Sequence, residues 1–443
     1  MNSKPQNNDK PIRNHSLSLF LIHLLLLRNR YISQPDPDPK WGTRPEIPEC
    51  NGIAYKVQPG ESLWIIGKRY GITVDQLLAE NPHISDPNVI NSGQIICIPK
   101  HHQGLSLTNI FDAASKRLSL TYLFGATSNQ YLDMLSKTQN SINVICPDYF
   151  DIDENGNLLL ATTEKLNQQF IDAIHGQGIK ITPFISNHFD RALGIIALNN
   201  RDKLSDQIAD AVEKYGLDGV DIDIENVTHE HRDMYTDFAR LLREKLPGNK
   251  VVSSAVAANP NGLTVGWHGS YDYKRLSDYC DYLMLMNYDE SYYGSVEGPV
   301  SSSDFFERSI QFVLNQEVPK DKIVVGIPFF GRYWKQGEEV GGIGLASRDV
   351  EFLTANYEST KYYDTATQSA HAVVTIKPND IEPNIWGGRK LTAGTYSIWY
   401  DSPEATKYKL QIINKYDVLG SGSWALGQEI LSIWDFYTQT LNK

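Results

Sequence analysis

Apolar runs of strand length alternate with amphipathic stretches of helical length from residue 118 to the end of the chain. Each run is rich in β-branched or aromatic residues and is bounded by turn residues, as is typical of buried strands. Eight strands are predicted: Leu118–Phe124, Ser141–Tyr149, Lys180–Ile185, Gly219–Glu225, Val251–Ala257, Tyr282–Tyr288, Ile323–Phe329 and Gly422–Leu426. The intervening helices include Thr163–His175, Asp202–Tyr215 and Thr228–Leu246. This alternation favours an α/β fold, a (β/α)8 TIM barrel over residues 115–443.

The connection between the seventh and eighth strands is too long for a single helix. It runs from Gly331 to about Leu391. A loop of that length without structure of its own is uncommon in a compact domain. The sequence therefore predicts a small inserted α+β subdomain at about residues 331–391 that walls a cleft.

The fourth predicted strand lies within LDGVDIDIEN, Leu217–Asn226. Side chains alternate between the two faces of a strand, so Asp221, Asp223 and Glu225 share one face. The three aliphatic residues between them share the other. Carboxylates are rarely buried without a task, so we expect them in the barrel lumen, with the aliphatic face under the helices.

Three neighbouring carboxylates in a partly dehydrated site cannot all remain ionised, so at least one pKa should be raised. Barrel enzymes keep their chemistry at the carboxyl ends of the strands. Glu225 lies nearest that end and is the candidate general acid. A divalent-metal site and a buried structural network of acids are the alternatives.

Asp218, Asp221, Asp223 and Glu225 reproduce a DxxDxDxE pattern that resembles the signature of glycoside hydrolase family 18. The resemblance implies that Glu225 protonates the glycosidic oxygen and that Asp223 orients the substrate's 2-acetamido group. Asp221 would share charge with Asp223. The acetamido oxygen would be the nucleophile in this substrate-assisted, retaining reaction. No metal and no organic cofactor are expected.

Other strand ends extend the resemblance. Met286, Tyr288 and Asp289 are similar to the family's M-x-Y-D motif, in which the tyrosine and the aspartate bind the acetamido group. GIPFFGRYW resembles its seventh strand and carries Arg332 at the rim. GSGSWALGQE resembles its eighth, in which Trp424 would floor the subsite of the reacting sugar.

Tyr149, Phe184 and Asn187 end the second and third predicted strands and are further candidates for lining the cleft. The third strand reads ITPFISNHF, without the SxGG motif that many chitinases of the family carry. The barrel therefore resembles the branch of bacterial spore-cortex and peptidoglycan hydrolases. Chitin remains an alternative substrate, and a catalytically silent glycan-binding protein is the alternative from another class.

Residues 50–100 form a separate unit with the pattern strand, helix, helix, strand, from Tyr55–Val57 to Gln94–Ile98. The segment is similar to a LysM domain, a βααβ module that binds N-acetylglucosamine chains of peptidoglycan or chitin. Its candidate glycan-binding residues lie in two loops: Gly60, Glu61, Ser62, Leu63, Asn81 and Pro82. The expected partner is thus a polysaccharide that contains N-acetylglucosamine.

Residues 1–48 are predicted to be an apolar segment followed by a proline-spaced linker, Gln34–Pro48. The run Leu17–Leu27 is too short to span a bilayer, but it has the length of a signal-peptide core. Its flanks are weak for that purpose, so targeting stays open. Cys50 and Cys97 bracket the small module and could be bridged or reduced.

Net charge and aromatic content indicate which class of ligand the protein binds. The net charge of −12 argues against a nucleic-acid backbone as partner. The 24 tyrosines suit a neutral sugar polymer, whose apolar ring faces stack on aromatic side chains. We expect a monomer without a membrane span that acts at the cell wall, at the spore cortex or outside the cell.

Overall fold

In the computed structural model of the protein, residues 50–99, except 51, 71, 73, 85 and 88, and residues 117–443 are described. The predicted apolar segment Leu17–Leu27 and the predicted linker Gln34–Pro48 lie outside these residues. Within the described part of the chain, no helix is long and apolar enough to cross a membrane.

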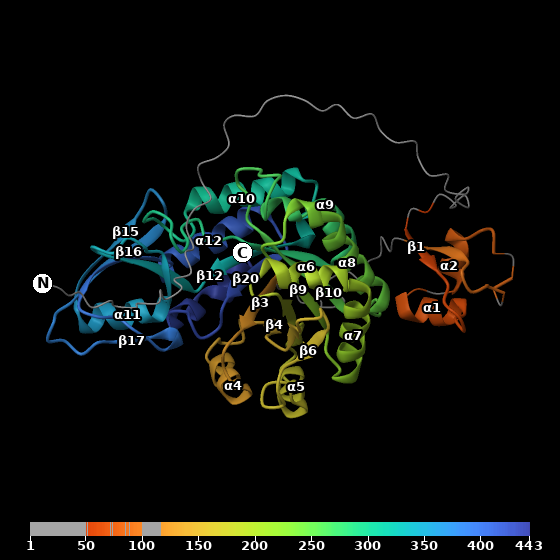
Figure 1. The fold of residues 1–443 in the computed structure, drawn as a ribbon, viewed down its shortest axis with the longest axis horizontal. Coiled ribbons are helices and arrows are strands. Elements are labelled where there is room, and N and C mark those ends of the chain that lie inside the picture. The colour runs from red at the N-terminus through yellow and green to blue at the C-terminus, as the bar shows by residue number, and fades with distance from the viewer. Residues whose placement is uncertain are drawn as a thin grey trace, which may run out of the picture. The chain divides into compact units, whose positions relative to one another are not determined.

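Parallel strands in eight positions form the barrel, with helices around them (Figure 1). In chain order they are β3 (Leu118–Leu123), β4 (Val144–Pro147), the pair β7 (Lys180–Ile181) and β8 (Phe184–Ser186), β9 (Gly219–Asp223), β10 (Val251–Ala257), β11 (Tyr282–Met286), β12 (Ile323–Pro328) and β20 (Gly420–Trp424). A short hairpin of β5 (Phe150–Ile152) and β6 (Leu158–Leu160) extends the sheet beside β8. The predicted α/β barrel is confirmed.

The third barrel strand is interrupted, so its prediction as one continuous strand was wrong. Proline has no N–H to donate to a ladder, and β7 and β8 are separated at Thr182 and Pro183. Hydrogen bonds to both neighbours nevertheless persist there. Thr182 N–H donates to the Ile145 carbonyl at 2.9 Å, and Asp221 N–H donates to the Pro183 carbonyl at 2.9 Å. The ring of strands therefore closes across the break.

The helices of the barrel begin and end as follows: α4 Ser128–Ser136, α5 Gln168–His175, α6 Arg191–Asn199, α7 Arg201–Lys214, α8 Arg232–Lys245, α9 Tyr273–Tyr279, α10 Ser303–Asn315, α12 Pro403–Tyr416 and α13 Tyr437–Leu441. Side-chain caps fix several starts. Asn167 caps α5 by accepting from Phe170 N–H, so the helix begins at Gln168 and not at the predicted Thr163. The predicted helix from Thr228 opens with a 3₁₀ turn, His229–His231, before α8.

Both faces of β9 are enclosed, as its sequence requires. Ile222 and Ile224 are fully buried in the core between the strands and the helices. A second core fills the lumen, where Tyr122, Phe184 and Met284 pack. The acidic face of β9 therefore lies inside the barrel.

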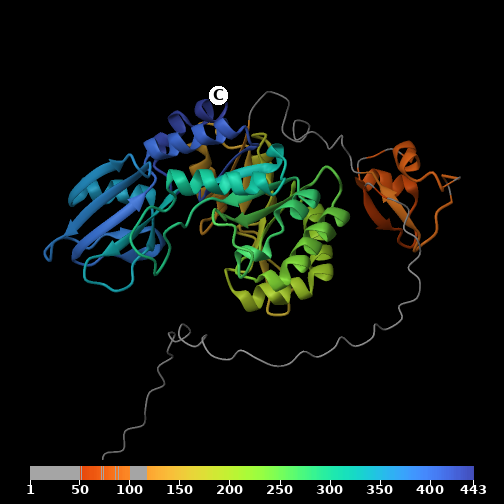
Figure 2. The ribbon, with the colours of Figure 1, turned by 90° about the horizontal axis from the view of Figure 1, so that it is seen from above.

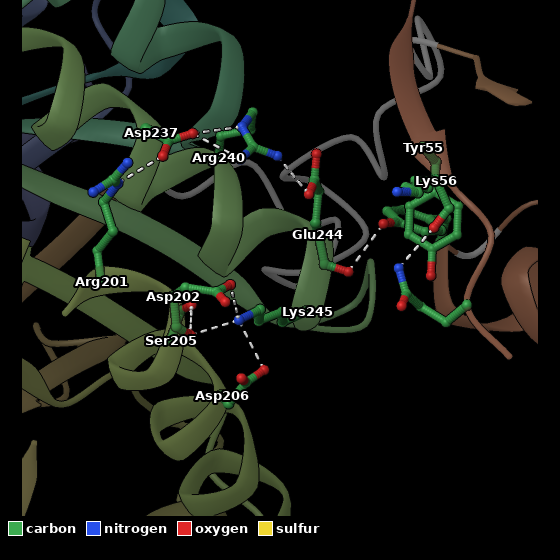
Figure 3. A network of polar contacts seen from close by, with 12 residues as sticks. Tyr55, Lys56, Arg201, Asp202, Ser205, Asp206, Asp237, Arg240, Glu244 and Lys245 are labelled. Atoms are coloured by element: carbon green, nitrogen blue, oxygen red, sulfur yellow. Dashed lines mark hydrogen bonds and ion pairs between the residues drawn. The ribbon is translucent and has the colours of Figure 1, made fainter. Parts of the chain in front are cut away.

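Ion pairs link α7 and α8 on the outside of the barrel (Figure 3). Asp237 accepts from Arg201 at 2.6 Å and from Arg240 at 2.7 Å. Lys245 pairs with Asp202 at 2.9 Å. These side chains are partly exposed, so each pair contributes at most about 1 kcal/mol.

The chain between β12 and α12 forms a five-stranded antiparallel sheet in the order β14-β13-β19-β16-β15. Its strands, drawn in blue in Figure 2, twist as a unit. Their bounds, with those of the covering helix, are β13 Phe330–Lys335, β14 Ile343–Ala346, α11 Ser347–Asn356, β15 Glu358–Asp364, β16 Ser369–Ile376 and β19 Gly394–Tyr400. A small ribbon of β17 (Asn384–Ile385) and β18 (Arg389–Lys390) precedes β19.

The N-terminal module has its own core. Strands β1 (Ile53–Lys56) and β2 (Ile95–Ile98) pair antiparallel, and α1 (Leu63–Tyr70) and α2 (Val74–Glu80) pack on them. Cys50 and Cys97 form a disulfide with an S–S distance of 2.03 Å, which answers the question left open by the sequence.

Removing Lys409 is expected to destabilise the barrel strongly. Lys409 on α12 is 1% exposed and contacts both oxygens of Asp401, which is 4% exposed, at 2.6 and 2.7 Å. Lys409→Met leaves that carboxyl buried without its partner, which costs about 3–5 kcal/mol. Thermal unfolding would show the loss. Lys274→Met is the matched control, because its pair with Asp278 is partly exposed and worth at most about 1 kcal/mol. Equal effects would contradict this account.

Candidate active site

Asp221 and Asp223 are held in the lumen by the register of β9 with its neighbours. Asp221 pairs with Ser253 on β10, and Asp223 with Ser186 on β8. The two carboxyl groups are almost inaccessible, at 1% and 6% exposed. Asp221 accepts hydrogen bonds from the Tyr122 hydroxyl at 2.7 Å and from the Ser253 hydroxyl at 2.6 Å.

Burial raises the pKa of all three predicted carboxyl groups. The pKa of Asp221 is raised to about 6. Burial, and then the charge of Asp221, raises the pKa of Asp223 to about 7. Burial, and then the charges of Asp223 and Asp289, raises the pKa of Glu225 well above its usual value. Burial therefore favours the protonated form of Glu225, the form that a general acid requires.

The variant Asp223→Asn is expected to reduce the pH dependence of stability. Between the unfolded pKa of about 3.9 and the folded pKa of about 7, the folded state keeps a proton that the unfolded state has released. Stability therefore falls as the pH rises through this window. Each pKa unit corresponds to about 1.4 kcal/mol. The fall in Tm between about pH 4 and about pH 8 should thus be smaller in the variant than in the wild type. An unchanged fall would mean that Asp223 ionises with an ordinary pKa.

The carboxyl ends of the strands surround a cleft of about 1200 Å³. Asp223 and Glu225 line it, and so do five other residues predicted for the site: Met286, Tyr288, Asp289, Arg332 and Trp424. Arg332 on β13 donates to one oxygen of Asp289 at 2.6 and 3.0 Å. The inserted sheet thus contacts the residue at the tip of β11.

Trp424 forms an aromatic floor with neighbouring strands. Its ring lies 5.3 Å from the Tyr122 ring and 5.7 Å from the Phe124 ring, between centroids. Its peptide bond to Ala425 is cis. Such flat apolar surfaces suit the faces of a sugar ring.

Three predicted cleft residues do not line the cleft, so those assignments were wrong. Tyr149, Phe184 and Asn187 are 1%, 3% and 0% exposed and are enclosed by protein. Phe184 packs edge-on against Tyr122 and Trp424. Asn187 hydrogen-bonds to the backbone of Glu225 and not to the open cleft.

Asp218, the first acid of the signature, lies at the opposite end of β9. Its carboxylate accepts from Ile181 N–H at 2.9 Å and contacts His175 Nε2 at 2.8 Å. It therefore joins strands and a helix away from the cleft.

The sequence interpretation missed several aromatic residues of the cleft: Phe124, Phe189, Trp267, Tyr292, Tyr293 and Trp386. Trp267 and Phe189 are in edge-on contact, with 5.2 Å between ring centroids. Tyr292 and Tyr293 are 57% and 67% exposed, three and four residues past Asp289. Two adjacent tyrosines after a strand end were a usable signal. Nothing in the sequence places Trp386, which comes from the insertion.

Five of the six predicted glycan-binding residues of the small module are either exposed or fully buried. Gly60, Ser62 and Pro82 are exposed in loops. Leu63 is 1% exposed in the module core, so its assignment as a contact was wrong. Asn81 is fully buried and exchanges hydrogen bonds with the backbone of Cys97, so its assignment was wrong too.

Glu61 is engaged within the same module. Its carboxylate accepts from the Tyr55 hydroxyl at 2.7 Å and pairs with Arg69. Among the described residues, no group of three or more histidine, cysteine or acidic side chains could hold a metal ion.

Comparison with known families gives two matches. The model for glycosyl hydrolases family 18 matches residues 115–429, and the model for the LysM domain matches residues 55–99. YdhD of Bacillus subtilis, named as a sporulation-specific glycosylase, is 28% identical over 388 residues, which cover 84% of each protein. The cortical fragment-lytic enzyme of B. subtilis is 22% identical over 59% of each chain.

Solved structures share the fold. The spore cortex-lytic enzyme SleL of Bacillus cereus has a TM-score of 0.62 at 22% identity, covering 88% of this chain and 86% of its own. A chitinase of Chromobacterium violaceum has a TM-score of 0.64 at 22% identity, covering 74% of this chain and 99% of its own.

Proposed function

The chain belongs to glycosyl hydrolase family 18, and on that premise we propose that it is a retaining N-acetylglucosaminidase of a bacterial cell-wall or spore-cortex glycan. The observation that carries the proposal is the raised pKa of Glu225 beside Asp223 in an aromatic-lined cleft. A protonated carboxyl group at the cleft wall can donate to a leaving glycosidic oxygen.

The proposed first step breaks the bond between C1 and the glycosidic oxygen. Glu225 gives its proton to that oxygen while the acetamido oxygen of the same sugar attacks C1, which forms a cyclic oxazolinium. Asp223 accepts from the acetamido N–H and balances the developing charge. Tyr288 donates its hydroxyl hydrogen to the acetamido oxygen. Asp221 holds a shared proton next to Asp223.

The second step restores the enzyme. The Glu225 carboxylate removes a proton from a water molecule, which attacks C1 and reopens the ring. The product keeps its anomeric configuration because C1 is attacked twice. Trp424 supports the reacting sugar from below, while Arg332 keeps Asp289 in place.

The cortical substrate is proposed because relatives named for cortex lysis and sporulation share the barrel over much of its length. The LysM domain contributes glycan binding to the same chain. A wall or cortex polymer offers N-acetylglucosamine to both domains. The protein would then act at the cell wall or outside the cell, as a monomer.

Deleting residues 1–100 is expected to reduce activity on insoluble wall by about tenfold or more, because a tethered binding domain raises the local concentration of the catalytic domain. Activity on soluble fragments should change little. Release of reducing ends from both substrates measures the two effects side by side. Equal losses would show that the LysM domain contributes to the fold of the barrel instead of to docking.

Chitin is the second candidate substrate, because the proposed mechanism needs only an acetamido group on the substrate and a cleft lined by aromatic residues. Turnover of chitin oligomers and of muramyl-containing fragments, at equal concentration of N-acetylglucosaminyl bonds, separates the two. Faster turnover of the muramyl fragments supports the cortex assignment.

A further inference from the structure

Glu225 lies beyond the regular part of its strand. β9 ends at Asp223, whose ladder partner on β8 is Ser186. The next residues of that neighbour leave the sheet, because His188 and Phe189 adopt positive φ values of 50° and 61°. No neighbouring strand backbone therefore continues the ladder beside Glu225 on this side.

The side chain of Asn187 takes over this role. Its Oδ1 accepts from Glu225 N–H at 2.8 Å, and its Nδ2 donates to the Glu225 carbonyl at 2.8 Å. Nδ2 also donates to the Asp190 carbonyl at 2.7 Å. A primary amide offers the same donor and acceptor as a peptide group. The fully buried Asn187 thus acts as one further peptide unit of β8.

A second contact fixes the residue after Glu225. Asn226 has a φ of 59°, and Arg191 donates to its carbonyl at 2.8 Å and to its Oδ1 at 2.9 Å. Gly194 on α6 makes room for this arrangement. A Cβ there would lie 2.7 Å from Asn187 Nδ2 and 2.8 Å from Val227 Cγ1.

We propose that Asn187 is a positioning residue that sets the direction of the Glu225 carboxyl group toward the glycosidic oxygen. The inference rests on the proposed function of Glu225 as the acid. Asn187 itself does not reach the cleft, so it acts through the backbone of Glu225. Its loss should impair proton donation and leave the binding of the sugar largely unchanged.

The test compares two substrates with the same N-acetylglucosaminyl group and different leaving groups. A chitin oligomer has a poor alcohol leaving group that needs protonation, whereas a 2,4-dinitrophenyl glycoside leaves without it. For Asn187→Ala, kcat/KM should fall by about 10²-fold on the oligomer, as expected for a misplaced catalytic group. It should fall less than about threefold on the aryl glycoside, where proton donation contributes little.

Asn143→Ala is the matched control. The Asn143 amide also bridges backbone groups, accepting from Ser119 N–H at 2.9 Å and donating to the Arg117 carbonyl at 3.2 Å, at the amino-terminal end of β3. Asn143→Ala should lower stability, but it should change kcat/KM by the same factor on both substrates. Asn187→Asp provides a second variant, since it keeps the acceptor for Glu225 N–H and loses the donor to the Glu225 carbonyl.

Equal losses on both substrates, or no loss in either Asn187 variant, would overturn the positioning role. If the wild type hydrolyses the oligomer but the Asn187 variants lose kcat/KM equally on both substrates, the proposed function is retained and the positioning role is rejected. If the wild type cleaves only muramyl-containing fragments, these replace the chitin oligomer in the same comparison. Wild-type protein that is inactive on both substrates and on the muramyl-containing fragments would overturn the proposed function and this inference with it.

Discussion

Glycans without N-acetyl groups are expected to resist hydrolysis, with kcat/KM lower by at least about 10³-fold than for the acetylated polymer. The reason is that the proposed nucleophile is the acetamido oxygen of the substrate, and intramolecular groups act at effective concentrations of roughly 10⁵ M or more. Asp223 and Tyr288 line the cleft beside the acid but would have no group to orient in a free amine.

The measurement uses one oligosaccharide before and after chemical de-N-acetylation, with product release followed by chromatography. Inhibition of wild-type turnover by the deacetylated oligosaccharide checks that it still binds. Efficient cleavage of the amine form would indicate that an enzyme carboxylate is the nucleophile, and Asp223 lines the cleft as a candidate.

Glu225→Gln is expected to lower kcat/KM on natural glycans by about 10²–10⁴-fold, the range that general acids contribute. Burial raises the pKa of Glu225 well above its usual value, so the wild type keeps the catalytic proton to a higher pH than an ordinary carboxyl group does and loses it as the pH rises further. Glutamine has no such proton, so the alkaline fall in kcat/KM that is due to Glu225 should disappear from the variant.

Asp218→Asn is the matched control for the acidic signature. Asp218 belongs to the same motif, but its partners Ile181 and His175 lie at the far end of β9. Its replacement should lower Tm and leave the pH profile of kcat/KM in place. If Asp218→Asn lowered kcat/KM as much as Glu225→Gln does, the acids of the motif would be needed for the fold of the strand and not for proton donation.

The alternation of apolar and acidic residues was enough to predict how β9 is buried. Ile222 and Ile224 lie in the core under the helices, and the acids lie in the lumen. The period of two determines the face of every side chain once both faces are enclosed. The break at Pro183 could have been predicted from its missing N–H, because the proline was visible in the strand pattern.

The mistaken assignment of Asn187 has a local cause. The periodicity of the third strand stops holding where His188 and Phe189 turn the backbone through positive φ. Asn187 consequently faces the Glu225 backbone. This contact depends on how close the two strands lie in space, so the sequence pattern of one strand could not predict it. Trp386 lines the cleft but was not predicted to do so. The path of the insertion depends on how its own sheet packs, which the sequence pattern does not reveal.

Product analysis by mass spectrometry decides whether the protein is an N-acetylglucosaminidase of a wall or cortex glycan. Spore-cortex and peptidoglycan fragments, beside chitin oligomers, are treated with the wild type and with Glu225→Gln. The wild type is expected to release muropeptides ending in reducing N-acetylglucosamine, and the variant is expected to release none. Cleavage of chitin alone would identify a chitinase instead, and binding without new reducing ends on any of these glycans would contradict the assignment of an enzyme.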